Sequence, residues 1–365
     1  MKKTGYDMLY LTVCAVNGTK PDMERIKDTD LEKLFQMSGF HSLTAAVCMA
    51  MESAGADLPA KWLEAKAKAI RKNILLDAER AKICSFMERQ GIWHMPLKGV
   101  VLKELYPRLG MRQMSDNDIL YDPSFQQQVR RFMEENGYTA ESVGKSNHDT
   151  YMKPPVYSFE LHTALFGGKS QFCEYYSDVR ERLISDGGYG LHFTDEDFYI
   201  YMTAHEYKHY SSGGAGLRSL ADFYVYRKAH PALDMDYIEA ELEKIGIPDF
   251  GRETAALAEK LFSDPFAELS EKERESLEYR IFSGTYGTVK NAVEKEIGSG
   301  SGTKYLLRRI FPDMEFYRSY YPFFYRHRLL LPAAWLHRLI RALISRRERI
   351  SAELKVLREK KKAKK

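Results

Sequence analysis

The chain has 365 residues, of which 44% are hydrophobic and 29% are charged, a composition that is typical of a folded globular protein and excludes wholesale disorder. This length is sufficient for two domains, or for one domain with large extensions. In the sequence, no apolar run approaches the roughly 20 residues that a membrane-spanning helix needs. The four cysteines lie far apart without a Cys-x-x-Cys pair, so we expect free thiols and a cytoplasmic location.

The formal net charge of +4 is unevenly distributed along the chain. Residues 336–365 carry nine net positive charges, which leaves the rest of the chain mildly acidic. This basic tail overlaps an apolar, Arg-containing segment at 329–344, and the combination could contact an anionic surface such as a membrane or a nucleic-acid backbone. An ordinary amphipathic helix with a solvated, Lys-rich end explains the same pattern, and we favour that interpretation.

Residues 1–90 are expected to form helices, because segments 40–47 and 69–87 place apolar residues three and four positions apart. Gly91 then stands where a helix-ending glycine is common. The apolar run 8–16 follows two lysines, but no small-x-small cleavage site comes after it. A first amphipathic helix is therefore favoured over a signal peptide.

The pattern changes to short strands and helices between residues 91 and 165, which predicts a compact mixed α/β unit within helical sequence. After residue 195 the pattern is helical again. The Gly-Ser run 298–302 is expected to be a flexible connection, because it lacks the strand and the Gly-Lys-Ser/Thr of a phosphate-binding loop. In the mixed unit, strands are predicted at 92–97, 115–121 and 156–162, and helices at 100–106 and 125–135.

Two carboxylates, Asp116 and Asp118, lie two positions apart on a predicted strand, so both side chains are expected on one face. Like charges held side by side repel each other unless a cation neutralises them. Glu160, on a later strand, could supply a third carboxylate, with His162 on the same face. Oxygen-only ligands suit Mg²⁺, and three carboxylates are enough for a two-metal site.

Lys98-Gly99 is a candidate phosphate contact, because it stands between a predicted strand and the first turn of a predicted helix. Arg112 is a candidate contact for substrate phosphates or for the carboxylates, and a surface salt bridge is the alternative. His162 is a candidate to orient Glu160 or to touch substrate, and a satisfied core histidine is the alternative. His148 is expected in a polar loop and receives no role.

Taken alone, Asp-x-Asp is more often a pair of solvated turn carboxylates than a metal site. The order of elements, with Lys-Gly before Asp-x-Asp and a later strand bearing Glu, favours the metal site. In these motifs the sequence resembles an uncharacterised bacterial nucleotidyltransferase family, related to the DNA polymerase beta-like nucleotidyltransferase superfamily. The residues that carry the resemblance are Leu97-Lys98-Gly99, Leu105-Tyr106-Pro107, Arg112, Ser115 to Leu120 and Phe159-Glu160-Leu161-His162.

The resemblance extends over most of the chain, although only these core motifs are specific. It implies Mg²⁺-dependent nucleotidyl transfer, with Asp116, Asp118 and Glu160 as catalytic metal ligands. The Gly-Ser that usually contacts the triphosphate in the superfamily is Lys98-Gly99 here, which puts the usual phosphate contact in doubt. The wider similarity includes His41, His205, His209, Leu217-Arg218, Asp222, Tyr321-Pro322 and Leu331 to Trp335.

A competing motif, His205-Glu206-x-x-His209, matches the helix signature of zinc metallopeptidases. Lys208 places a positive charge between the two histidines, and Ser212 and Ala215 stand where the extended motif requires Gly and His. Asp222 could be a distant third ligand, although it also matches the helical segment of the family. Two helix histidines packed near the active site are the favoured interpretation.

The combined prediction is an α+β protein, in which a small mixed-sheet nucleotidyltransferase core is flanked by N-terminal and C-terminal helical regions. The predicted regions are a helical one, the core, a second helical domain, and a linker with the basic helical tail, at 1–90, 91–190, 191–297 and 298–365.

The predicted reaction moves a nucleoside monophosphate from a nucleoside triphosphate to an unknown hydroxyl acceptor, which could be a protein, a small molecule or RNA, and releases pyrophosphate. Mg²⁺ is the expected ion and Mn²⁺ the alternative. A non-catalytic nucleotide- or RNA-binding module on the same fold is the second interpretation, and a zinc metallopeptidase is the third.

Overall fold

In a computed structural model, the protein divides into two compact units, Met1–Tyr207 with Gly216–Thr285, and Lys208–Ala215 with Tyr286–Lys365. The structure describes residues 1–144, 146–168, 170–185, 187–284, 293, 302–312, 314, 316–317, 321–345, 350–351 and 353–357.

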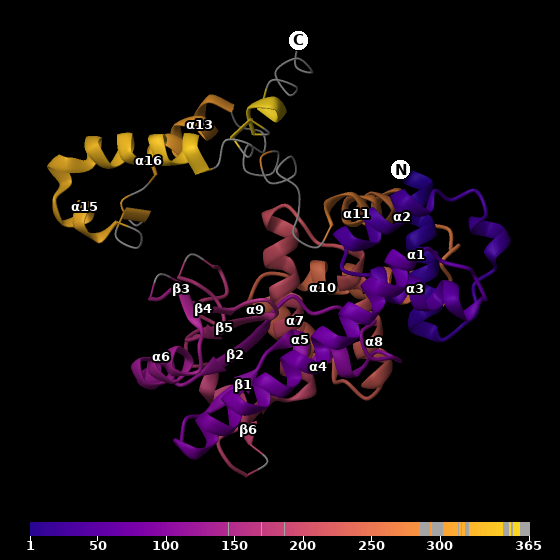
Figure 1. The fold of residues 1–365 in the computed structure, drawn as a ribbon, viewed down its shortest axis with the longest axis horizontal. Coiled ribbons are helices and arrows are strands. Elements are labelled where there is room, and N and C mark those ends of the chain that lie inside the picture. The colour runs from indigo at the N-terminus through magenta and orange to yellow at the C-terminus, as the bar shows by residue number, and fades with distance from the viewer. Residues whose placement is uncertain are drawn as a thin grey trace. The chain divides into compact units, whose positions relative to one another are not determined.

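A mixed β-sheet lies within the first unit, flanked by helices, which confirms the predicted α+β fold class (Figure 1). In the described part of the chain its strand order is β1-β2-β5-β4-β3; β2 and β5 pair in parallel, and the other neighbours are antiparallel. Two further strands, β6 and β7, form a separate antiparallel pair. The strands are β1 (His94–Pro96), β2 (Asn117–Tyr121), β3 (Thr139–Ser142), β4 (His148–Lys153), β5 (Tyr157–His162), β6 (Leu183–Ser185) and β7 (Leu191–Phe193).

The three predicted strands are present as β1, β2 and β5, and the two predicted helices of this region are α5 (Lys98–Glu104) and α6 (Gln126–Glu135). β2 begins at Asn117, later than predicted, so Asp116 immediately precedes the strand. The expectation that His148 lies in a loop is wrong, because His148 is the first residue of β4.

Helices make up most of the rest of the first unit. The predicted first helix is α1, which is ended by Gly18 at φ 66°, in the left-handed region that favours glycine. Asp30 caps α2 by accepting from the N–H groups of Glu32 and Lys33, and Ser270 forms a capping box with Glu273 on α11. Among the helices that the structure describes, none is both long and apolar enough to cross a membrane. The remaining elements are α1 (Lys2–Asn17), η1 (Met23–Ile26), α2 (Leu31–Phe40), α3 (Thr44–Ser53), α4 (Ala60–Arg89), η2 (Pro123–Phe125), η3 (Val179–Arg182), α7 (Asp195–Ser212), α8 (Leu217–Ala229), α9 (Met235–Lys244), α10 (Pro248–Ser263) and α11 (Glu271–Ser283).

The two faces of the sheet pack in different ways, and this difference positions the site. On one face, Ile119 of β2 and Phe159 and Leu161 of β5 form an apolar cluster with residues of α4 and α6. Leu120 points to the other face and belongs to a second cluster, which includes residues of α7 and α8. The side chains of β2 and β5 that alternate with Ile119, Phe159 and Leu161 therefore face α7 and α8.

The second unit contains α13 (Gly302–Ile310), α15 (Pro322–Arg326), η4 (Arg328–Leu330) and α16 (Leu331–Ser345). The amphipathic segment predicted at 329–344 is thus helical, with Leu329 and Leu336 exposed. Most of the Gly-Ser run, and the Lys-rich end from residue 358 onward, lie outside the described residues.

Candidate active site

Asp118 of β2 and Glu160 of β5 are direct partners in the register of the parallel pair. Partner residues on neighbouring strands project from the same face of a sheet, so these two carboxylates lie side by side although they are distant in the sequence. Leu97 strengthens this end of β2 by donating its N–H to the carbonyl oxygen of Asp118 at 2.9 Å. The parallel pairing therefore creates an acidic pair between two segments.

Asp116 joins this pair because Asn117 points the other way. Asn117 is fully buried, and its amide donates to the carbonyl oxygen of Leu76 on α4 at 2.9 Å. Burial, and then the negative charges of Asp118 and Glu160, raise the pKa of Asp116 from 3.8 to about 7. The three carboxylates that the sequence singled out thus lie in one site.

The raised pKa of Asp116 has a testable consequence for stability. Between pH 4 and 7 the folded state holds a proton that the unfolded state releases, so the folded state loses stability as pH rises through this window. Asp116→Asn stays neutral, and we expect it to raise the free energy of unfolding at pH 8, by at most about 4 kcal/mol. Urea unfolding of parent and variant at pH 5 and pH 8 measures the effect.

The gain should be smaller at pH 5, where the folded state keeps the proton of Asp116 and the unfolded state has only begun to gain from its release. Mg²⁺ should raise the melting temperature of the parent at pH 8 more than that of the variant. An Asp116→Asn protein that is less stable than the parent at pH 8 would contradict the electrostatic origin of the raised pKa.

Two histidines border the carboxylates. His162 Nε2 lies 3.7 Å from Asp118 Oδ1 and 3.7 Å from Glu160 Oε2, and His148 Nε2 lies 3.6 Å from the same oxygen of Glu160. Within the described part of the chain, Asp118 Oδ1 and His162 Nε2 are buried without a hydrogen-bond partner. The sequence predicts a role for His162, but it predicts a loop at His148 and so does not indicate that this histidine joins the site.

Two positively charged side chains, Lys72 and Arg218, interact electrostatically with Asp116, and the sequence alone predicts neither interaction. Lys72 on α4 donates to the carbonyl oxygen of Ser115 at 2.5 Å; burial lowers the pKa of its amine, and the charge of Asp116 opposes that shift. Arg218 on α8 donates to the carbonyl oxygen of Gln113 at 3.0 Å, and its charge lowers the pKa of Asp116. Lys72 lies one helical turn before Leu76, which packs on the sheet, and this spacing is the signal that could have identified it.

Lys98, the first residue of α5, is half-buried, and its Nζ lies 3.3 Å from Nδ1 of His205 on α7. Burial lowers the pKa of the Lys98 amine, and the charge of Glu206 opposes that shift. A Cβ at Gly99 would lie 2.8 Å from the methyl carbon of Met114. Because that methyl group is the end of a flexible side chain, a small residue at this position could be accommodated by a shift of Met114.

Arg112 is buried, and it forms a two-point ion pair with Asp222 of α8, with Nε–Oδ1 and Nη2–Oδ2 distances of 2.8 and 3.0 Å. The hydroxyl of Tyr106 donates to Asp222 Oδ1 at 2.8 Å. Burial alone would raise the pKa of Asp222, but the charge and hydrogen bonds of Arg112 lower it overall. Arg112 thus connects the segment before β2 to α8 and is not at the surface.

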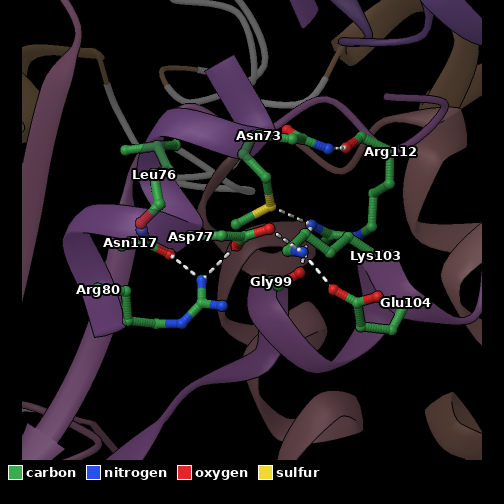
Figure 2. A network of polar contacts seen from close by, with 10 residues as sticks. Asn73, Leu76, Asp77, Arg80, Gly99, Lys103, Glu104, Arg112 and Asn117 are labelled. Carbon is green, nitrogen blue, oxygen red and sulfur yellow. Dashed lines mark hydrogen bonds and ion pairs between the residues drawn. The ribbon is translucent and has the colours of Figure 1, made fainter. Parts of the chain in front are cut away.

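Helix α4 also contacts this segment, through the polar network that Figure 2 shows. The amide of Asn73 donates to the carbonyl oxygen of Arg112 at 3.2 Å, and Arg80 donates to Asn117 Oδ1 at 3.2 Å. Asp77 pairs with Arg80 and with the buried Lys103 of α5, both at 2.7 Å. The segment that contains Asp116 and Asp118 is therefore held in place by α4 and α8.

Helix α7 brings Tyr201 and His205 toward the site. Burial, and then the charge of Asp118, raise the pKa of Tyr201, whose ring lies 6.0 Å from that of His205. Asp222, the third ligand that the sequence offered for a zinc peptidase, is instead hydrogen-bonded to Arg112 and Tyr106. Among the residues that the structure describes, the group of three that could hold a metal ion is His148, Glu160 and His162, on the sheet.

One comparison with known proteins found a match. A family model described as "Uncharacterised nucleotidyltransferase" matches residues 27–263, which is more than half of the chain and includes every residue of the site. No curated protein and no solved structure matches the chain.

Proposed function

The chain belongs to this uncharacterised nucleotidyltransferase family, and from this premise we propose that it transfers a nucleoside monophosphate from a nucleoside triphosphate to a hydroxyl acceptor with the help of Mg²⁺. The acceptor oxygen forms a bond to the α-phosphorus, the bond from the α-phosphorus to the bridging oxygen breaks, and pyrophosphate leaves. The proton of the acceptor hydroxyl passes to solvent or to a carboxylate of the site.

The parallel pairing of Asp118 with Glu160, with Asp116 beside them, is the observation that carries this proposal. The donor set fits Mg²⁺, which prefers oxygen ligands and is bound through a few carboxylates and substrate phosphates. Asp118 Oδ1 fits in particular, because it is a buried acceptor that no donor of the described protein satisfies. When bound, Mg²⁺ supplies positive charge for the triphosphate and lowers the pKa of the acceptor hydroxyl.

The protein's own residues then have separate tasks. Asp116, Asp118 and Glu160 would hold the ion, and its positive charge would favour loss of the proton from Asp116, whose pKa is raised by burial and the neighbouring carboxylates. Lys72 and Arg218 limit the repulsion that the three carboxylates exert on the triphosphate, since both already act on Asp116.

The test is incubation of the full chain with α-labelled nucleoside triphosphates, Mg²⁺ or Mn²⁺ and a cell extract. We expect the label to move to an acceptor fraction in a divalent-ion-dependent way. Binding of nucleotide with no transfer to any fraction would favour the non-catalytic binding module.

Lys98 is proposed as the contact for the β- and γ-phosphates. Its amine is half-buried, and its pKa is lowered by that burial, so a bound phosphate would stabilise its charge. Lys98→Ala should weaken triphosphate binding by roughly ten- to a hundredfold, which corresponds to the loss of a charge-assisted contact of about 1.5–3 kcal/mol. Titration calorimetry with a triphosphate and with the matching monophosphate measures this difference.

Monophosphate binding should change much less, and Lys98→Arg should restore triphosphate binding only in part, because a planar guanidinium does not replace a point charge. Lys33→Ala, at an exposed lysine of α2, is the matched control. Unchanged triphosphate binding in Lys98→Ala would assign the phosphate contact to other groups.

A further inference from the structure

His148, Glu160 and His162 form a ligand group of mixed chemistry beside the two aspartates. His148 and His162 are direct partners in the antiparallel pair of β4 and β5, and Glu160 lies two residues before His162 on β5. All three side chains therefore project from one face. One ligand atom of each residue lies within 4.8 Å of the other two.

The distances fit a shared ion better than direct hydrogen bonds. The imidazole nitrogens lie 3.6 and 3.7 Å from Glu160 Oε2, which is longer than a hydrogen bond. Two ligand atoms of a tetrahedral site lie about 3.4 Å apart when each bond to the metal is about 2.1 Å long. His162 Nε2 is buried and has no hydrogen-bond partner among the described residues, so this nitrogen is a candidate ligand atom.

We propose that His148, Glu160 and His162 bind one divalent transition-metal ion of the Fe²⁺–Zn²⁺ group, next to the position of Mg²⁺. Imidazole nitrogen suits these ions, whereas Mg²⁺ prefers oxygen. The two halves of the site then select different ions, with Asp116 and Asp118 on the oxygen-ligand side and the histidines on the other. The inference rests on the proposed function only in taking Asp116, Asp118 and Glu160 as the Mg²⁺ ligands, with Glu160 shared between the two ions.

The experiment titrates the full, metal-stripped chain with Co²⁺, a spectroscopic substitute for Zn²⁺, in the presence of excess Mg²⁺. We expect one Co²⁺ per chain, with visible d–d absorption that Mg²⁺ does not remove. In His148→Gln and His162→Gln the affinity should fall at least about a hundredfold, because even the loss of a residue that only orients a ligand costs 10- to 100-fold.

Asp116→Asn and His209→Gln are the matched controls, and both should keep the Co²⁺ site. His209→Gln breaks the competing His205-Glu206-x-x-His209 motif without altering the sheet. Should a histidine variant fail to fold, the proton NMR spectrum of the Co²⁺-loaded parent decides, since two coordinated imidazoles give two shifted, exchangeable N–H signals.

Displacement of Co²⁺ by Mg²⁺, unchanged binding in both sheet variants, or loss of binding in His209→Gln would overturn the inference. Failure of the inference and failure of the proposed function are distinguishable. Nucleotide transfer without a histidine-bound Co²⁺ removes only the inference, and a histidine-bound Co²⁺ without nucleotide binding removes only the proposed function.

Discussion

In Asp118→Asn, we expect nucleotidyl transfer to fall by at least about a thousandfold, with no loss in the free energy of unfolding, because removal of this charge relieves its repulsion with Asp116. Asp118 pairs with Glu160 and contributes the buried oxygen that no donor of the described protein satisfies. An active-site ion contributes several kcal/mol to the transition state, and about 4 kcal/mol corresponds to roughly a thousandfold in rate. Initial rates of label transfer at saturating Mg²⁺, together with urea unfolding, measure both quantities.

Asp122→Asn is the matched control, because Asp122 immediately follows the same strand and caps the short helix η2 through Ser124. Asparagine caps a helix about as well as aspartate, so this variant should keep both activity and stability. Transfer within tenfold of the parent in Asp118→Asn would remove Asp118 from the proposed chemistry.

The largest loss of stability is expected from Asp222→Ala. The substitution leaves Arg112, which is 5% exposed, without its buried counter-charge, and it leaves the hydroxyl of Tyr106 without its acceptor. Removal of one partner of a buried ion pair typically costs about 3–5 kcal/mol. Equilibrium urea unfolding, monitored by circular dichroism, measures the change.

The double variant Arg112→Met with Asp222→Leu serves as the control for this prediction. Replacement of both charges by apolar groups of similar size should recover much of the loss, because no charge then remains buried and unpaired. A cost below about 1 kcal/mol for Asp222→Ala would mean that solvent reaches Arg112 in solution.

The acidic part of the site was predictable because it depends on two properties that a sequence displays. Period-two alternation assigns Asp116 and Asp118 to one face, and the family motif adds Glu160 from a later strand. The parallel pairing of β2 with β5 then brings Asp118 beside Glu160. The fold class was predictable for the same reason, since short alternating segments lie within helical sequence.

Of the two histidines, His162 was predictable but His148 was not, because β4 does not have the hydrophobic pattern of a half-buried strand. Its buried positions include Asp149, which is 1% exposed and is satisfied by the side chain of Gln126 and the N–H of Gly144. From the sequence alone, a buried carboxylate whose hydrogen bonds are satisfied cannot be distinguished from a polar residue of a loop. His148, next to Asp149, was placed in a loop for that reason.

The surroundings of Arg112 show a second limit. Its partner Asp222 lies on a helix more than a hundred residues later, and the hydrogen bond from Asn73 reaches it from α4. Local spacing carries no information about contacts of this range, so a buried arginine cannot be distinguished from a surface one. The burial of Arg112 therefore depends on partners that are distant in the sequence.

Asn117 lies between the two aspartates, faces α4 and bonds to Leu76 and Arg80. Slippage of β2 by one position would exchange its faces, burying two acids against a helix and offering a neutral amide to the nucleotide. The hydrogen bonds of Asn117 can form in one register of β2 only. They therefore fix which side chains of β2 lie on the opposite face, where the carboxylates are. Natural selection for nucleotidyl transfer would thus constrain the side chain of Asn117, although this side chain faces away from the site.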